Sequence, residues 1–223
     1  LAEIPKLKYG ANSDPIVVAG QVVDTIGEAF RMLRFNLDFM ARDARVIMLT
    51  STVPGEGKSF VSRNLAYTLS LIGKRVVLVD TDIRRRTQSR LLAKGSGRKG
   101  LTSFLAGVED DVTKLIVKED DEHHLDFMPA GMTPPNPAEL LMSDRLERCV
   151  EQLKQHYDYI VIDNVPAQVV ADAGIVNRVA DITLYVIRVG RIDRRYLPQL
   201  EEMHKEGKFK NLSVVLNGLN LPK

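Results

Sequence analysis

Short apolar runs rich in β-branched residues recur along the chain. They span residues 45–49, 75–79, 159–162, 182–189 and 212–216. Each run is apolar almost without interruption, which is typical of strands that are covered by helices on both faces. The pattern therefore predicts a mostly parallel sheet with these segments among its strands.

Segments of helical periodicity lie between the runs. In residues 26–40 the apolar positions follow a 4-3-4-3 spacing: Ile26, Phe30, Leu33, Leu37 and Met40. Residues 61–72 also have a helical spacing, and Ser143 is a predicted N-cap for a helix that reaches residue 155. Strands that alternate with helices are joined by right-handed crossovers. We therefore expect a three-layer α/β fold, with a mostly parallel central sheet and helices on both faces.

The first 25 residues follow neither pattern and contain Pro5, Gly10 and Pro15. We expect residues 1–25 to form an extended arm and residues 26–223 to form one domain, because a chain of 223 residues is near the size of a single domain. Residues 128–141 are predicted to form a proline-rich loop that leads into a short helix.

Composition and charge narrow the class of protein. The chain is 44% hydrophobic and 27% charged, as soluble globular proteins are. A net charge of +2 gives no bulk attraction to nucleic acid, which is therefore not an expected partner. One cysteine excludes an internal disulfide. No apolar run approaches the roughly 20 residues of a membrane helix.

The strongest chemical signal is the segment LTSTVPGEGKSF, residues 49–60. A predicted strand leads directly into Gly55, Gly57, Lys58 and Ser59, and a helix follows. Glycines allow backbone N–H groups to surround phosphate oxygens, the lysine reaches the β and γ phosphates, and the serine ligates Mg²⁺. The first glycine of the usual pattern is replaced by Thr52. A glycine-rich turn that only caps a helix is the alternative, but the flanking strand and helix favour nucleotide binding.

Two further predicted strands end in carboxylates. The strand VVLV is followed by Asp80 and Asp82, and the strand YIVI is followed by Asp163. Ligands of open α/β sheets bind at the carboxyl ends of strands, and Mg²⁺ prefers oxygen ligands. A carboxylate that does not bind the metal can accept a hydroxyl proton. The alternative for Asp80 and Asp82 is a turn that caps the next helix.

Several polar residues have two open interpretations. Asn217 ends the last predicted strand, where its amide either recognises an adenine edge or forms an Asn-Gly turn. Residues 84–99 contain seven basic residues and no acid, and they form either a solvated face or a surface for phosphate or an acidic partner. The same choice applies to four arginines after the penultimate strand: Arg188, Arg191, Arg194 and Arg195.

With these segments assembled, the chain resembles the catalytic domain of the bacterial tyrosine kinases of capsule and exopolysaccharide export. These are P-loop relatives of the septum-positioning and partitioning ATPases. Four segments carry the resemblance: the E-x-x-R-x-x-R motif at Glu28, Arg31 and Arg34, the Walker A segment 54–59, the second Walker segment 79–85 and the proline-rich segment 129–141.

The resemblance implies a P-loop fold, the cofactors ATP and Mg²⁺, and tyrosine autophosphorylation in trans within a ring. Lys58, Asp80 and Asp82 are the implied catalytic residues. Ser59, Asp82 and Asp163 are the implied metal ligands, and Glu28, Arg31 and Arg34 the implied ring contacts. The nucleotide contacts are Pro54, Gly55, Glu56, Gly57, Lys58, Ser59, Phe60 and Asn217.

The implied partners are other copies of the chain, the tyrosine-rich tail of a neighbour, and a membrane-spanning activator that is fused or separate. The implied location is the inner face of the bacterial plasma membrane, for a domain that is itself soluble. Two departures stand out. Asn164 and Val165 follow the Walker B acid where the family has other residues, and no tyrosine-rich tail follows Asn217. The absent tail and the start at Leu1 lead us to expect a trimmed chain. A nucleotide-switched ATPase and an assembly module with little kinase activity are the alternatives.

Overall fold

The computed structural model describes residues 1–6, 16–18, 25–92, 99–120, 124–167 and 172–220. Within them an eight-stranded sheet has the order β1-β8-β7-β2-β6-β3-β5-β4. All neighbouring strands are parallel except β4 and β5. The strands are β1 (Ala2–Pro5), β2 (Val46–Ser51), β3 (Val76–Asp80), β4 (Val117–Asp120), β5 (Leu125–Met128), β6 (Tyr159–Asp163), β7 (Ile182–Arg188) and β8 (Ser213–Leu219).

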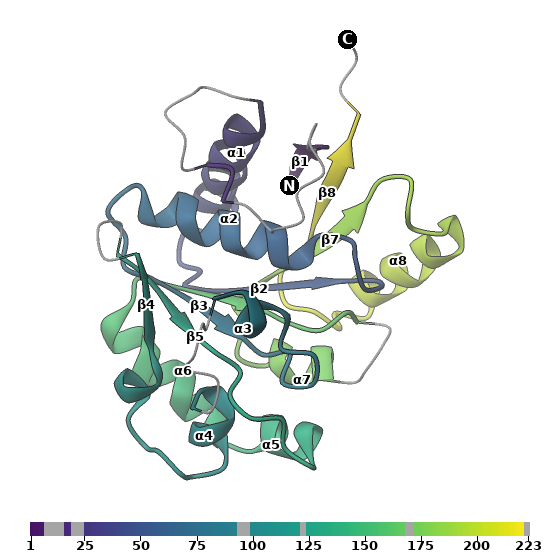
Figure 1. The fold of residues 1–223 in the computed structure, drawn as a ribbon. Coiled ribbons are helices and arrows are strands. Elements are labelled where there is room, and N and C mark those ends of the chain that lie inside the picture. The colour runs from purple at the N-terminus through teal and green to yellow at the C-terminus, as the bar shows by residue number, and fades with distance from the viewer. Residues whose placement is uncertain (7–15, 19–24, 93–98, 121–123, 168–171, 221–223) are drawn as a thin grey trace.

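Helices cover both faces of this sheet (Figure 1). On one face lie α1 (Thr25–Met40) and α2 (Lys58–Ser70). On the other lie α4 (Leu101–Leu105), α5 (Pro137–Met142), α6 (Arg145–His156) and α7 (Asp172–Asn177). The remaining elements are α3 (Thr87–Leu92), α8 (Leu197–Lys205) and the short 3-10 helices η1 (Val112–Leu115) and η2 (Arg194–Tyr196). The predicted three-layer fold is confirmed.

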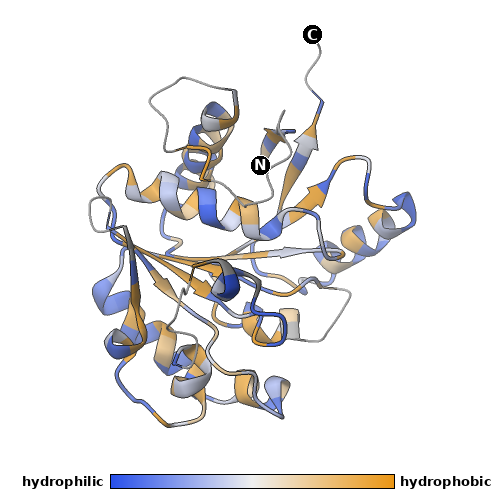
Figure 2. Ribbon diagram, in the orientation of Figure 1, coloured by the Kyte–Doolittle hydropathy of each residue, from blue (hydrophilic) through white to orange (hydrophobic). Residues whose placement is uncertain are grey.

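Each face of the sheet has its own hydrophobic core, because successive side chains of a strand point to opposite sides. Along β2, Val46 and Met48 pack with the α4–α7 layer, whereas Ile47 and Leu49 pack with α1 and α2. All of β2 is buried, which explains why the sequence of this strand is apolar without alternation. The strands form an apolar band between the two helix layers in Figure 2.

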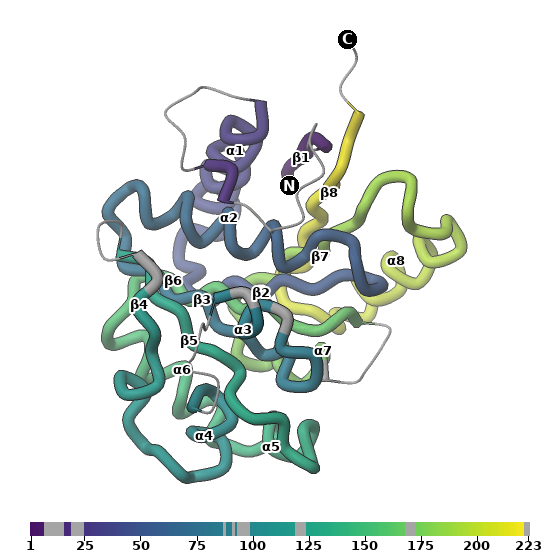
Figure 3. The backbone as a smooth tube through the Cα atoms, in the orientation of Figure 1, coloured from purple at the N-terminus to yellow at the C-terminus, as the bar shows by residue number. Residues whose placement is uncertain are grey.

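Some predictions of local structure were wrong. The segment Ala2–Pro5 forms the edge strand β1, paired with β8, although no strand was predicted in residues 1–25. Figure 3 shows β1 beside β8. Strands β4 and β5 were not predicted either. Helix α6 begins at Arg145 with Asp144 at the N-cap position, and Ser143 instead donates its hydroxyl to the Leu140 carbonyl.

No helix in the described part of the chain is both long enough and apolar enough to cross a membrane. The predicted strands 45–49, 75–79 and 159–162 correspond to β2, β3 and β6, which lie side by side in the centre of the sheet. Their carboxyl ends are therefore adjacent, and each carries one of the segments predicted to have a chemical role. This adjacency is what the fold contributes to the site.

Candidate nucleotide-binding and active site

The loop between β2 and α2 depends on two glycines in the left-handed region. Gly55 has a φ of 86° and Gly57 a φ of 89°, which residues with a side chain adopt only with strain. A Cβ atom on Gly57 would also lie 2.1 Å from Nδ2 of Asn217. The loop can therefore turn tightly into α2, so that the N-terminal N–H groups of this helix are available to an anion.

A cavity of about 270 Å³ adjoins this loop. Six of the eight predicted nucleotide contacts line it: Pro54, Gly55, Gly57, Lys58, Ser59 and Phe60. The rest of the lining is Ser51, Asp82, Arg85 and Pro166. The lining residues therefore come from the carboxyl ends of β2, β3 and β6 or from the segments after them. Arg85 belongs to the basic stretch 84–99, for which a surface for phosphate was one of two open interpretations, and its place in the lining favours that interpretation. Pro166 was not predicted as a cavity residue.

The other two predicted contacts, Glu56 and Asn217, support the loop from behind. The buried carboxylate of Glu56 accepts hydrogen bonds from the N–H groups of Val53 at 2.8 Å and Arg188 at 3.4 Å. Asn217 donates its amide to the Glu56 carbonyl at 2.9 Å. Burial raises the pKa of Glu56. Asn217 lies inside β8 rather than in a turn, so the Asn-Gly turn interpretation was wrong.

Lys58 forms a buried ion pair with Asp163. Its Nζ lies 2.5 Å from Oδ1 of Asp163, and the two residues are 8% and 0% exposed. The second carboxylate oxygen, Oδ2, is buried and has no hydrogen-bond partner among the described residues. A buried oxygen without a donor is unfavourable and leaves this carboxylate one free acceptor for a cation or its water.

Asp80, at the end of β3, is fully buried directly opposite Asp163 in the pairing of β3 with β6. Its Oδ1 accepts the N–H of Asp82 at 3.1 Å, and its Oδ2 accepts the N–H and hydroxyl of Ser89 at 2.9 and 2.7 Å. Burial, followed by the charge of Asp163, raises the pKa of Asp80 to about 7. This carboxylate can therefore gain or lose a proton near neutral pH. Ser89 was missed by sequence reasoning.

The predicted metal ligands are brought together around the cavity. Ser59 and Asp82 line it, whereas Asp163 does not line it but pairs with Lys58, which does. The described residues contain no group of three or more His, Cys, Asp or Glu side chains that could hold a metal by themselves. Mg²⁺ retains waters and uses phosphate oxygens together with one or two protein ligands. These residues therefore fit a Mg²⁺ ion that arrives with a nucleotide, rather than a metal held by protein ligands alone.

Comparisons with known proteins place these features in a family. A family model described as an AAA domain matches residues 44–205. The tyrosine-protein kinase CpsD of Streptococcus agalactiae is 34% identical over 86% of this chain and 82% of its own length. This chain belongs to the bacterial P-loop tyrosine kinase family. The tyrosine-protein kinase YwqD of Bacillus subtilis is 35% identical over 88% of the chain and 82% of its own length. The kinase domain of the Escherichia coli tyrosine kinase ETK superposes with a TM-score of 0.85 at 29% identity, covering 100% of this chain and 92% of that domain.

The departure from the family pattern after the Walker B acid has a structural role in this chain. Asn164 is fully buried, and its Oδ1 accepts the Thr81 hydroxyl at 3.1 Å and the Val165 N–H at 2.8 Å. The Val165 carbonyl accepts the hydroxyl of Thr50 at 2.8 Å. These bonds connect the ends of β2, β3 and β6, so the loop before Pro166 is held against the cavity.

The family's proline-rich segment is connected to Asp80 through Ser89. The hydroxyl of Ser89 donates to Asp80 and accepts the N–H of Ala130 at 2.8 Å. The carbonyl of Pro129 accepts the N–H of Leu101 at 2.8 Å. The proline-rich segment therefore does not line the cavity but supports Asp80 through Ser89.

The E-x-x-R-x-x-R residues lie on α1 and do not line the cavity. Glu28 and Arg31 form an exposed ion pair at 2.8 Å. Arg34 instead turns toward α2, where it donates to the Thr68 carbonyl at 3.4 Å. Their predicted role in assembly therefore concerns a surface separate from the cavity.

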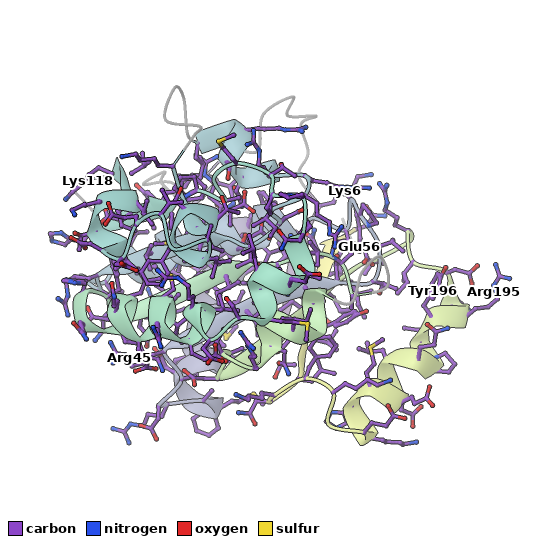
Figure 4. The ribbon with its side chains drawn as sticks, turned by 90° about the horizontal axis from the view of Figure 1, so that it is seen from below. Lys6, Arg45, Glu56, Lys118, Arg195 and Tyr196 are labelled. Atoms are coloured by element: carbon purple, nitrogen blue, oxygen red, sulfur yellow. The ribbon has the colours of Figure 1, made fainter. Side chains whose placement is uncertain are left out.

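Two of the four arginines near the end of β7, Arg191 and Arg195, have different surroundings. The guanidinium of Arg191 lies against Gly55, where a Cβ atom would be 2.7 Å from its Nη2. Arg195 pairs with Asp193 at 2.6 Å and its side chain is 88% exposed. Figure 4 shows Arg195 and Tyr196 projecting outward before α8, whereas Glu56 lies within the body of the protein. Arg195 is thus a solvated surface residue.

Proposed function

We propose that this chain is an ATP- and Mg²⁺-dependent protein tyrosine kinase. The observation that carries the proposal is the convergence of three features at one cavity. These are a phosphate loop with Lys58 and Ser59, Asp82 in the cavity lining, and the buried carboxylates of Asp80 and Asp163, of which Asp163 pairs with Lys58. Membership of the bacterial tyrosine kinase family supports the choice of a tyrosine hydroxyl as acceptor.

Each side chain then has a role in the transfer. Lys58 and the loop N–H groups would hold the phosphates, and Ser59, Asp82 and Asp163 would hold Mg²⁺, which would neutralise phosphate charge. The tyrosine oxygen attacks the γ-phosphorus as the bond to ADP breaks. Asp82 faces the cavity, and Asp80, with a pKa of about 7, can hold a proton at neutral pH. Whichever of these two carboxylates is not bound to the metal accepts the tyrosine proton.

We infer that the acceptor tyrosines belong to the tail of a neighbouring copy within a ring, and that Glu28, Arg31 and Arg34 contribute to its contacts. The exposed apolar side chains of Met32 and Phe39 on the same helix support a protein contact there. We also propose that a membrane-spanning activator, fused or separate, acts on this chain. The proposed biological role is the control of exopolysaccharide or capsule export at the inner face of the plasma membrane.

The test uses γ-labelled ATP, Mg²⁺, the chain and a tyrosine-rich acceptor peptide, with phosphotyrosine and free phosphate counted separately. Label on tyrosine is expected, and it is expected to disappear in both Lys58→Met and Asp80→Asn. The thermal stability of both variants is measured alongside, so that lost activity is not confused with lost fold.

Two other outcomes would replace the proposal. Free phosphate without phosphotyrosine would favour a nucleotide-switched ATPase. Nucleotide binding with neither product would favour an assembly module. The sequence of the phosphate loop disfavours a switch ATPase. The septum-positioning and partitioning ATPases have a further lysine at the position where this chain has Val53.

A further inference from the structure

Arg85 shares the cavity with the phosphate loop. It lines the same space as Lys58, Ser59 and Asp82. Its backbone N–H donates to Oδ1 of Asp82 at 2.9 Å, and the N–H of Arg86 donates to the Asp82 carbonyl at 2.7 Å. This tight turn fixes the position of the Arg85 backbone three residues after Asp82, the predicted metal ligand.

The guanidinium of Arg85 has no protein partner in the part of the chain that the structure describes. No salt bridge and no side-chain hydrogen bond engages it, and the residue is exposed. The next arginine differs, because Arg86 donates its Nη1 to the Gly131 carbonyl at 2.8 Å. Arg85 is thus a cation beside the cavity, and no carboxylate among the described residues pairs with it.

The position of Arg85 within the cavity indicates which phosphate it faces. In a phosphate loop the lysine reaches the β and γ phosphates and the serine ligates Mg²⁺, which bridges oxygens of the same two phosphates. Asp82, Ser59 and Lys58 therefore mark the γ-phosphate end of the cavity, and the backbone of Arg85 is tied to this end by its N–H bond to Oδ1 of Asp82.

The charges at this end leave a role for a further cation. Lys58 is paired with Asp163, and Asp82 adds a negative charge to the cavity. Phosphoryl transfer spreads negative charge over the equatorial oxygens of the transferred group, and a guanidinium can bind two such oxygens at once. A free arginine at the γ-phosphate end has the chemistry for this task.

We propose that Arg85 is a further catalytic residue, which binds the γ-phosphoryl group and stabilises the negative charge that develops during its transfer. The inference rests on the proposed kinase function. Arg85 exchanges no proton: the bond between the γ-phosphorus and ADP breaks, the bond to the tyrosine oxygen forms, and the tyrosine proton goes to the Asp80–Asp82 pair.

The experiment compares Arg85→Ala and Arg85→Lys with Arg90→Ala, a control at an exposed arginine on α3 that does not line the cavity. The first measurement is binding of fluorescent ADP with Mg²⁺, with and without aluminium fluoride as a mimic of the transferred phosphoryl group. The second is the rate of phosphotyrosine formation. The binding measurement needs no acceptor, so it remains informative even if the wild type transfers no phosphate to tyrosine.

For Arg85→Ala we expect ADP affinity within about twofold of wild type, a loss of about 100-fold or more in affinity for the ADP–aluminium fluoride complex, and a fall in kcat of about 10³-fold. Arg85→Lys should recover only a small part of the rate, because an ammonium is a point charge rather than a planar fork. Arg90→Ala should match wild type. Two results would overturn the inference: unchanged binding of the aluminium fluoride complex, or a loss confined to the KM of the acceptor peptide.

Discussion

Replacing Lys58 by methionine should destabilise the nucleotide-free protein, apart from any effect on catalysis. The Lys58 ammonium lies 2.5 Å from the carboxylate of Asp163. Asp163 is fully buried and lies opposite Asp80 in the pairing of β3 with β6. Methionine keeps a long side chain with a good helix propensity, so the main change is the loss of the charge. It leaves a buried carboxylate without a counterion, next to a second carboxylate.

Removing one partner of a buried ion pair costs about 3–5 kcal/mol of unfolding free energy. With an m-value of about 2 kcal/mol per molar urea, the midpoint of urea unfolding should fall by about 2 M. The assay is urea unfolding followed by circular dichroism at constant pH and salt, without nucleotide. An unchanged m-value would show that the two-state analysis still applies.

The matched control is the double variant Lys58→Met with Asp163→Asn, in which the charge left behind is also removed. It should recover most of the lost stability, because a neutral amide is far less costly to bury than a carboxylate. A loss below about 1 kcal/mol in the single variant, or a double variant as unstable as the single one, would refute this account of the pair.

Three further predictions concern other parts of the molecule. The pKa of Asp80 is about 7 in the folded state, against an ordinary value of 3.8. Protonation of Asp80 therefore stabilises the folded state at acidic pH, and this stabilisation is lost as the pH rises through the folded-state pKa. The wild type should therefore lose about 3 kcal/mol of unfolding free energy from pH 5 to pH 8 in urea unfolding, and the Asp80→Asn variant should not show this loss. A difference in unfolding free energy between the two proteins that does not change with pH would contradict the raised pKa of Asp80. Gly57→Ala should abolish nucleotide binding and lower the melting temperature more than Gly73→Ala does. Both glycines have positive φ, but only at Gly57 would an added Cβ atom meet a neighbour, the amide of Asn217 at 2.1 Å. Equal falls in melting temperature would mean that backbone strain alone matters. Glu28→Ala should change the unfolding free energy by less than about 0.5 kcal/mol, since its ion pair is exposed, but should reduce the assembled fraction in sedimentation velocity if α1 is a ring contact.

The sequence predicted the central strands and the phosphate loop because their signals are local. A strand buried on both faces must be apolar throughout, and a loop that surrounds phosphate needs glycine at fixed positions. Strand β1 has no such signal. It is four residues long and includes Glu3 and Pro5, and it is held by pairing with β8, more than 200 residues away in the chain.

The pairs within the site could not be predicted for a related reason. Asn217 and Glu56 are separated by 161 residues, and Lys58 and Asp163 by 105. Their contacts follow from the strand order, which places β6 beside β2, and periodicity along the chain carries no information on that order. Ser89 is only nine residues from Asp80, but a serine at the start of a short helix has no distinguishing pattern.

The ion pair between Lys58 and Asp163 has a consequence for how the site accepts its ligands. The Lys58 ammonium lies 2.5 Å from Asp163 and has three N–H donors, so a phosphate group either shares it with Asp163 or draws it away. A phosphate that draws Lys58 away would leave both oxygens of a fully buried carboxylate without a partner, because Oδ2 already has none among the described residues. That state is unfavourable unless another cation approaches the carboxylate. A divalent ion that arrives with the phosphates would supply that charge, which gives a physical reason for the pairing of Lys58, at the start of α2, with Asp163, at the end of β6.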